Sequence, residues 1–407
     1  MENVEIEDLK FGKLDKTQKF QFQTKDLTKI SRIDTISPPS VFVGSKLKYP
    51  FVNVGILSPL NEDRDAWLYD DAKYWAQNNF SIKNVLDLRN NLLNSRFKSR
   101  VTDVRTNKKF VEISKEIAIS SKQVDVEIEL NKCINLNRDK DRVLTPHGMR
   151  AGLKDAKITS NVKIDSKVDK IINDEIRASE GLNYLYKNNI NEYLLAKILS
   201  IGVLGLKKNK KMVPTRWSIT ATDDSLSREI INSIKEFPII NEHVLFFGEF
   251  LGNQYLIMLF PDVWNFELFE LYYPGSSWNP STDFRASTDF EDFNGRKEYA
   301  FNCAGGYYAT RFPIVEYLKS IKRQASVLVV RLETPSYWAG LGVWVVRESV
   351  RKALERGEMK FNSREEFLDS IKKIAKIKFD FSISQVLVKS KILNLIKTQK
   401  KLGDFGL

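Results

Sequence analysis

The chain has 407 residues and a formal net charge of +12, with 42% apolar and 29% charged residues, which is typical of a globular protein. That length is enough for two or more domains. No run approaches the roughly 18 apolar residues that a membrane span needs, and the acidic N-terminus lacks the apolar centre of a signal peptide. Two cysteines and two histidines, none closely spaced, indicate a reducing cytoplasm and argue against a Cys-rich zinc site or a catalytic triad.

The N-terminal third predicts an arm, a helix and a strand. Residues 1–35 are charged and weakly patterned, and the Pro-Pro pair that follows separates them from the rest. Ser81 is placed to cap a helix whose apolar residues extend to Leu92 and Leu93. Val124–Leu130 alternates apolar and acidic residues, as a half-buried antiparallel strand does. The acidic side chains of that strand could ligate Mg²⁺, although a solvated strand face explains the same alternation without an ion.

The remaining pattern mixes helices and strands. Helical spacing begins at Ser166, and the Pro- and Asp-rich stretch 272–299 reads as a long loop. Strands are expected at 213–222, 243–250, 254–260, 326–333 and 341–346, and helices at 347–356 and after the capping box Ser363–Glu366. The fold class is therefore α/β or α+β, with a mixed or antiparallel sheet core, flanking helices and a basic helical C-terminal region that ends in a flexible tail.

The domain boundaries follow the same changes of pattern. We expect an N-terminal arm at 1–35, domains at 36–150 and 151–360, a basic helical segment at 361–398 and a docking tail at 399–407.

Positive charge is unevenly distributed along the chain. Residues 351–407 hold 14 Lys and Arg against 7 Asp and Glu, a net of +7. A second cluster comprises Lys207, Lys208, Lys210, Lys211 and Arg216. Such local excess is typical of proteins that bind a phosphate backbone. For the cluster at 207–211, a solvated hairpin tip is an equally good interpretation.

The last nine residues match a short docking peptide for a DNA sliding clamp. Gln399, Leu402 and Phe405 follow the pattern Gln, two spacers, aliphatic, two spacers, aromatic. In a 3₁₀ turn, residues three apart project in the same direction, so Leu402 and Phe405 would form one apolar plug. Leu407 would fill the space that a second aromatic usually takes. The alternative is a frayed terminus without function.

Several segments resemble the archaeal DNA repair protein family called NreA. They run in the family's order and cover roughly 37 to 360: SPPSVFVG at 37–44, YPxVNVG at 49–55, SSKxVDVE at 120–127, VPTRWSIT at 213–220, GGYYAxR at 305–311 and YWAxLGVWVVRE at 337–348. The resemblance implies a cytoplasmic archaeal protein of DNA damage repair that acts with the sliding clamp (PCNA). Family members often carry a Cys-rich zinc segment near the N-terminus, which this chain lacks.

A group of arginines and aromatics is the best candidate for nucleic-acid contact. Guanidinium groups donate two parallel hydrogen bonds to phosphate, and Arg216, Arg311, Arg323, Arg331 and Arg347 lie among apolar segments that hold few carboxylates. Trp217, Tyr307, Tyr308 and Trp338 could stack an unpaired base. For any one of these residues, an internal Arg–Glu pair or a core aromatic is the simpler interpretation.

Catalysis remains an open alternative at this point. Asp223, Asp224 and Glu333 are candidate metal ligands or acid/base groups, with Mg²⁺ as the possible cofactor. The adjacent pair Asp223–Asp224 could equally cap a helix. The favoured function is a DNA repair factor recruited by the clamp that binds DNA through a basic surface. A metal-dependent nuclease or phosphodiester hydrolase and an RNA-binding protein are the alternatives.

Overall fold

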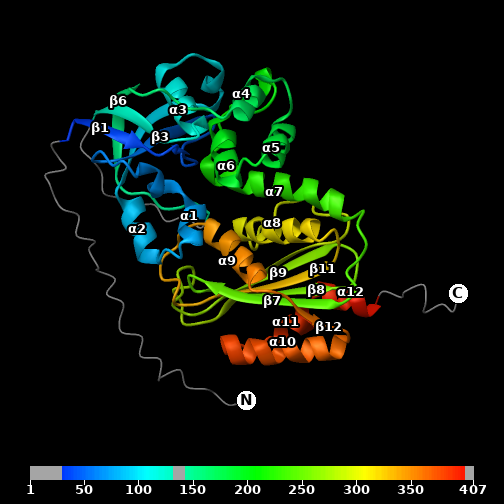
Figure 1. Ribbon diagram of the computed structural model, residues 1–407. Coiled ribbons are helices and arrows are strands. Elements are labelled where there is room, and N and C mark those ends of the chain that lie inside the picture. The colour runs from blue at the N-terminus through cyan, green and yellow to red at the C-terminus, as the bar shows by residue number, and fades with distance from the viewer. Residues whose placement is uncertain (1–29, 132–142, 399–407) are drawn as a thin grey trace.

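Residues 30–131 and 143–398 are described by the computed structural model of the protein (Figure 1). Within these ranges the chain forms two six-stranded mixed sheets and twelve α-helices. The α+β class is therefore confirmed. No helix in the described ranges combines the length and apolarity needed to cross a bilayer. The docking tail lies outside the described residues.

The first sheet is built from the N-terminal part of the chain. Its strands are β1 (Arg32–Ser37), β2 (Val41–Val43), β3 (Phe51–Pro59), β4 (Leu92–Arg100), β5 (Val124–Leu130) and β6 (Arg150–Ile158), in the order β1-β5-β6-β4-β3-β2. Neighbours are antiparallel except β4 and β6. The prediction for β5 is confirmed, because its four apolar residues are buried. On the other face Glu127 accepts from Arg32 and Glu129 pairs with Lys154, as expected of a solvated face.

Ten described helical segments lie between the strands of the first sheet in the sequence or connect that sheet to the second. They are η3 (Ala66–Asp70), α1 (Ala72–Gln77), α2 (Ile82–Asn90), η4 (Val101–Arg105), α3 (Lys109–Ile119), α4 (Ser166–Asn173), α5 (Ala178–Lys187), α6 (Glu192–Ile201), η5 (Lys207–Asn209) and α7 (Thr215–Ile234). The cap at Ser81 is confirmed, since its Oγ accepts from Asn84 N at 3.2 Å. The extension of that helix to Leu92 and Leu93 is wrong, because both residues begin β4.

The strand expected at 213–222 is a helix. Pro214 precedes the first turn of α7, where a missing N–H costs nothing. Inside the helix, Ser218 Oγ donates to Thr215 O at 2.9 Å, so a residue that favours other conformations is satisfied locally. The helix then packs between α6 and α8 (Gly305–Ser320). Burial between two helices therefore outweighs the strand propensity of its Thr and Trp residues.

The second sheet is built from the C-terminal half. Its strands are β7 (His243–Phe250), β8 (Asn253–Phe260), β9 (Asn265–Tyr272), β10 (Arg285–Glu291), β11 (Ser326–Glu333) and β12 (Met359–Phe361), in the order β10-β9-β11-β8-β7-β12. The predictions at β7, β8 and β11 are confirmed. The loop expected at 272–299 contains β10, an edge strand whose polar sequence pairs along β9. Such an edge strand carries little hydrophobic signal.

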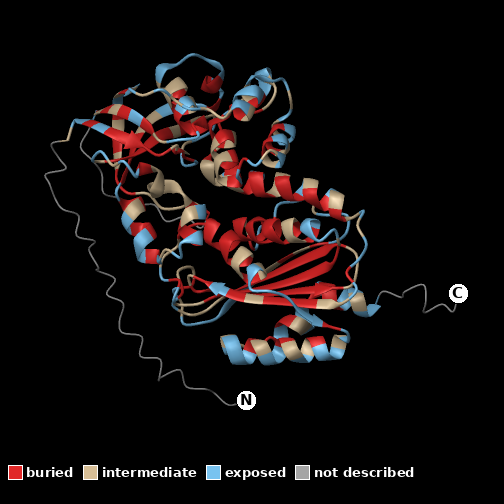
Figure 2. Cartoon of the chain, viewed as in Figure 1, coloured by how far each residue is buried: buried red, intermediate tan, exposed pale blue. Residues whose placement is uncertain are grey.

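Helices cover both faces of the second sheet (Figure 1). On one face, Val327 and Val329 join the core that includes α8 and α9 (Trp344–Glu355). On the other, Leu328 and Val330 join a core with α10 (Arg364–Phe379), α11 (Ser384–Lys389) and α12 (Lys391–Thr398). Figure 2 shows the sheet and α8 buried and much of α10 exposed. The strand expected at 341–346 is wrong, because α9 begins at Trp344.

Capping contacts define the starts of two C-terminal helices. Ser363 Oγ accepts from Glu366 N at 3.1 Å, which confirms the N-cap. The buried Glu267 of β9 accepts from Lys391 N at 3.0 Å and from Ile392 N at 3.2 Å. A carboxylate at a helix N-terminus satisfies N–H groups that lack intrahelical partners. The start of α12 is thereby tied to a core strand.

Candidate functional site

Three of the candidate arginines lie in buried ion pairs with acids from other segments. Arg311 donates to Glu291 and to Asp224, both at 2.6 Å. Arg347 donates to both oxygens of Asp223 at 2.7 Å. All three of Arg311, Arg331 and Arg347 are at most 5% exposed. The expected shortage of carboxylates near these arginines is therefore wrong, since the fold brings the acids in.

The candidate acids Asp223 and Asp224 lie in the interior of α7. They are neither at a strand end nor at a helix cap, because the segment before them is helical. Each has an arginine partner. Among residues 30–131 and 143–398, no group of three or more His, Cys, Asp or Glu side chains could hold a metal ion.

Arg331 and Glu333 form part of a buried network on β11. The guanidinium donates to Glu270 at 2.5 Å, to Glu333 at 3.0 Å and to Asn253 at 2.6 Å. The second carboxylate oxygen of Glu333 accepts from the backbone N–H of Trp278 at 3.1 Å. Burial raises the pKa of Glu333 although Arg331 opposes the shift. The network therefore holds the 273–279 loop against the end of β11.

The candidate stacking residues divide by exposure. Tyr307 and Tyr308 are 0% and 4% exposed and pack in the core. Trp217 is 59% exposed and Trp338 is 40% exposed. Only these last two of the four candidates therefore present an indole surface to a partner.

The lysine cluster at 207–211 begins in η5 and is largely at the surface. Lys207, Lys208 and Lys211 are exposed, whereas Lys210 Nζ donates to Ile172 O at 2.6 Å. The segment is held beside η4, since Met212 N donates to Val101 O at 2.8 Å. Arg216 and Arg323 are half-buried. The expected hairpin tip is wrong, because 207–209 form a 3₁₀ turn between two helices.

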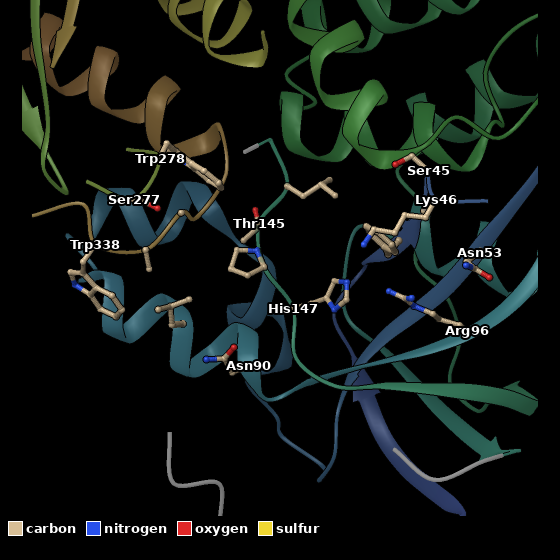
Figure 3. A pocket seen from close by; sticks show the side chains of 17 residues that line it. Ser45, Lys46, Asn53, Asn90, Arg96, Thr145, His147, Ser277, Trp278 and Trp338 are labelled. Carbon is tan, nitrogen blue, oxygen red and sulfur yellow. The ribbon is translucent and has the colours of Figure 1, made fainter. Parts of the chain in front are cut away.

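A cavity of about 340 Å³ opens between the first sheet and the loops beyond the second. Its lining combines residues of five segments, namely Phe42, Gly44, Ser45, Lys46, Asn53, Leu86, Asn90, Arg96, Leu144, Thr145, Pro146, His147, Ser277, Trp278, Trp338, Ala339 and Gly340. Figure 3 shows the two tryptophans at one end and Lys46 and Arg96 at the other. None of these described lining residues is Asp or Glu. A larger hollow of about 560 Å³ beside η3 differs, because Asp70 and Asp71 line it.

The aromatic end of the cavity is fixed by close packing. Trp278 is held through its backbone by Glu333, and Ser277 N donates to Tyr337 O at 3.0 Å. Gly340 lies against the indole, since a Cβ there would come within 2.3 Å of Trp278 Cζ2. Asn90, on α2, lies between Trp338 and His147 in the view of Figure 3 and is 4% exposed. Its Nδ2 has no hydrogen-bond partner among the described residues.

The cationic end is built on β4 and the segment that precedes β6. The Asn94 amide lies 3.1 Å from His147 Nε2. With its oxygen turned to that side, the amide also accepts from Arg96 Nε and Nη2 at 3.3 and 3.2 Å. Phe42 packs edge-on against His147. Arg96 Cζ lies over the Phe42 ring, 5.6 Å from its centroid. The guanidinium is therefore held in place at the cavity wall.

His147 reports the electrostatic character of this end. Burial, followed by the positive charges of Arg89, Arg96 and Arg150, lowers its pKa to about 3. The imidazole is therefore neutral near pH 7. The contribution of the three arginines to this shift reflects positive potential at the ring, which an anion in the cavity would relieve.

Comparison with known proteins identifies the family. Residues 13–279 match the model "Archaeal Nre, N-terminal", and residues 291–405 match "Archaeal Nre, C-terminal". The chain belongs to the archaeal Nre family. Over 352 residues it is 40% identical to the DNA repair protein NreA of Archaeoglobus fulgidus, covering 86% of this chain and 87% of the relative. No solved structure matches the chain.

Two further Nre relatives show similar sequence identity to this chain. The DNA repair protein NreA of Haloferax volcanii is 36% identical over 359 residues, covering 87% of this chain and 85% of the relative. The DNA repair protein NreB of Archaeoglobus fulgidus is 35% identical over 339 residues, with coverage of 83% and 84%.

Three of the six segments that carry the Nre resemblance line the cavity. The first ends at Gly44, the second contains Asn53, and the last contains Trp338 and Gly340. The first also contacts the VPTRWSIT segment, because Val43 N donates to Thr215 Oγ1 at 2.8 Å. Sequence reasoning found Trp338 but missed Asn90, Arg96, His147 and Trp278. These residues lie in separate segments of the sequence, and only the fold brings them together. A half-exposed arginine on a strand, such as Arg96, belongs to no recognisable sequence motif.

Proposed function

We propose that the chain is a DNA damage repair factor that binds DNA and is recruited to it by the sliding clamp. The observation that carries the proposal is the likeness to three relatives that are each named as DNA repair proteins. The net charge of +12 supports DNA as the partner, because neutralising phosphates is the main source of affinity in such complexes.

The surface segment 207–217 supports the DNA contact. It presents Lys207, Lys208 and Lys211 at one end and the exposed indole of Trp217 at the other. Cations beside an exposed aromatic suit a strand whose phosphates and unpaired bases are both accessible. Arg311, Arg331 and Arg347 are not part of this surface, since they lie in buried pairs.

The C-terminal pattern Gln399, Leu402, Phe405 supports recruitment by the clamp. An apolar residue pair presented on one side of a short turn can fill a groove on a partner. The basic residues before it, Lys397, Lys400 and Lys401, would suit an acidic rim.

The DNA-binding part is tested by fluorescence anisotropy with a labelled 20-nucleotide single strand at several salt concentrations. We expect affinity to fall steeply with salt, and the triple change Lys207→Gln, Lys208→Gln, Lys211→Gln to lower both the affinity and the slope. The matched control is Lys154→Gln with Lys157→Gln, two exposed lysines on β6. A flat salt response in the unaltered protein would contradict the proposal.

A further inference from the structure

We propose that the cavity between the first sheet and the 338–340 segment binds one unstacked nucleotide of a DNA strand. The base would pack against the indoles of Trp278 and Trp338, and its phosphate would lie between Lys46 and Arg96 (Figure 3). The inference rests on the proposed DNA-binding function and names the part of DNA that this site takes.

The size of the cavity selects the ligand. At about 340 Å³ it lies at the lower end of the range of about 300–1,000 Å³ seen for small-molecule sites. A duplex cannot enter such a space, whereas one nucleotide can. A base from a duplex must therefore leave its stack to reach the site, and a base in a single strand or at a lesion does so at least cost.

The aromatic end is suited to a base. Trp338 is 40% exposed, so one side of its indole is available for stacking. Trp278 is already fixed by Glu333 and Gly340. The Trp278 side chain is therefore already ordered before a ligand binds, so binding does not lose free energy by ordering it.

Asn90 supplies the polar contact that a base edge needs. Its Nδ2 is buried and has no hydrogen-bond partner among the described residues, and a buried donor left unpaired is costly. Acceptors on the edge of a base, either a ring nitrogen or a carbonyl oxygen, would satisfy it. An apolar ligand would leave this cost in place.

The cationic end is suited to a phosphate. The Arg96 guanidinium is held by Asn94 and Phe42, and a guanidinium fork binds phosphate oxygens in pairs. The exposed Lys46 adds a second positive charge at this end. None of the described lining residues is acidic, so none of them opposes an anion.

Calorimetry with the full chain tests the proposal. We expect dAMP, dGMP, dCMP or dTMP to bind more than tenfold more tightly than the matching nucleoside or inorganic phosphate. Trp338→Ala should weaken the best nucleotide about 5- to 150-fold and leave the weaker phosphate binding unchanged. Lys46→Gln should weaken nucleotide and phosphate alike. Phe301→Ala, an exposed aromatic in the loop before α8, is the control and should change neither.

The two histidines of the chain give a second, local readout. His147 lies in the cavity wall, and His243 packs against Phe260 and Phe367 at the start of β7. NMR of protein labelled at histidine should show the His147 signals shifting on nucleotide addition and those of His243 unchanged. Nucleotide binding that neither shifts His147 nor responds to Trp338→Ala would overturn the inference.

The inference and the proposed function fail in different ways. If single-stranded DNA binds with a steep salt response but no mononucleotide shifts His147, the cavity is not the nucleotide site and the DNA-binding proposal survives. If mononucleotides bind as described but no DNA does, the cavity is a site for free nucleotides and the DNA-binding proposal fails.

Discussion

Glu333 links a buried arginine to a cavity wall: one carboxylate oxygen accepts from Arg331 at 3.0 Å and the other from the backbone N–H of Trp278 at 3.1 Å. A residue that sequence reasoning offered as a catalytic acid thus positions an aromatic side chain. Its carboxylate bridges strand β11 and the loop after β9, so the wall of the cavity depends on the core of the second sheet.

Glu333→Ala should therefore destabilise the fold and loosen the cavity. Arg331 keeps Glu270 but loses one carboxylate in a buried site, where breaking an ion pair costs about 3 kcal/mol or more. Urea unfolding measures this loss. The control is Glu249→Gln, an exposed carboxylate on β7, which should change stability by less than about 0.5 kcal/mol. Equal effects of the two changes would contradict the linking role.

Gly340→Ala should displace Trp278. A methyl group there would meet the indole at 2.3 Å, far inside van der Waals contact, so the ring must move. We expect a changed near-ultraviolet circular dichroism spectrum and weaker nucleotide binding. The control is Gly152→Ala on β6, where the nearest atom that a Cβ would meet, Asn131 Cβ, lies 3.5 Å away. An unchanged spectrum for Gly340→Ala would contradict this packing.

His147 should make the protein less stable as the pH falls below about 6.5. Its folded-state pKa is lowered to about 3, so between that pH and 6.5 the unfolded chain binds a proton that the folded protein does not. The stabilisation that comes from the neutral histidine is complete above pH 6.5, and about 2 kcal/mol of it is lost at pH 5. His147→Asn should show a smaller difference in unfolding free energy between pH 7.5 and pH 5. The same difference in both proteins would refute the lowered pKa.

Glu267→Ala should release α12 from the second sheet. The carboxylate accepts from two N–H groups of the helix and from Ser390 Oγ, and loss of a cap costs about 0.5–2 kcal/mol. We expect faster trypsin cleavage at Lys391 and Lys397. The control is Glu298→Ala, an exposed carboxylate in the loop before α8. Protection equal to that of the unaltered protein would show that apolar packing alone holds α12.

Leu402→Ala with Phe405→Ala should abolish binding to the sliding clamp, because both members of the apolar pair are removed. The melting temperature should stay the same. Calorimetry against the purified clamp measures the loss, and Lys400→Ala with Lys401→Ala is the control, with a smaller effect that depends on salt. Unaltered clamp binding by the first variant would refute the docking role.

Periodicity predicted the parts of the fold whose environment is simple. The strand at Val124–Leu130 and the buried run at Ser326–Glu333 were predictable, because one or both faces are covered by apolar residues. The helix from Thr215 was not, since packing between α6 and α8 decides its conformation. The arginines were misjudged for a related reason. Glu291 and Asp223 lie 20 and 124 residues from the arginines that they meet, and spacing alone does not reveal such partners.

The cavity was the least predictable feature. Trp338 was identified as a candidate for base stacking, but the amide of Asn90 and the guanidinium of Arg96 carry no local pattern. These residues form a site only because α2, β4 and the 338–340 segment lie close together in the fold. The approach of these segments depends on how the N-terminal and C-terminal halves of the chain pack together. No short stretch of the sequence predicts that packing.

If the sliding clamp binds as proposed, the attachment of α12 limits its distance from the folded part of the protein. Glu267 fixes the first turn of α12, which ends at Thr398, and Leu402 follows four residues later. Four extended residues span at most about 14 Å. Under that proposal, a ring seated on Leu402 would lie within this distance of the end of α12, and so short a tether would keep the protein beside the ring at high effective concentration.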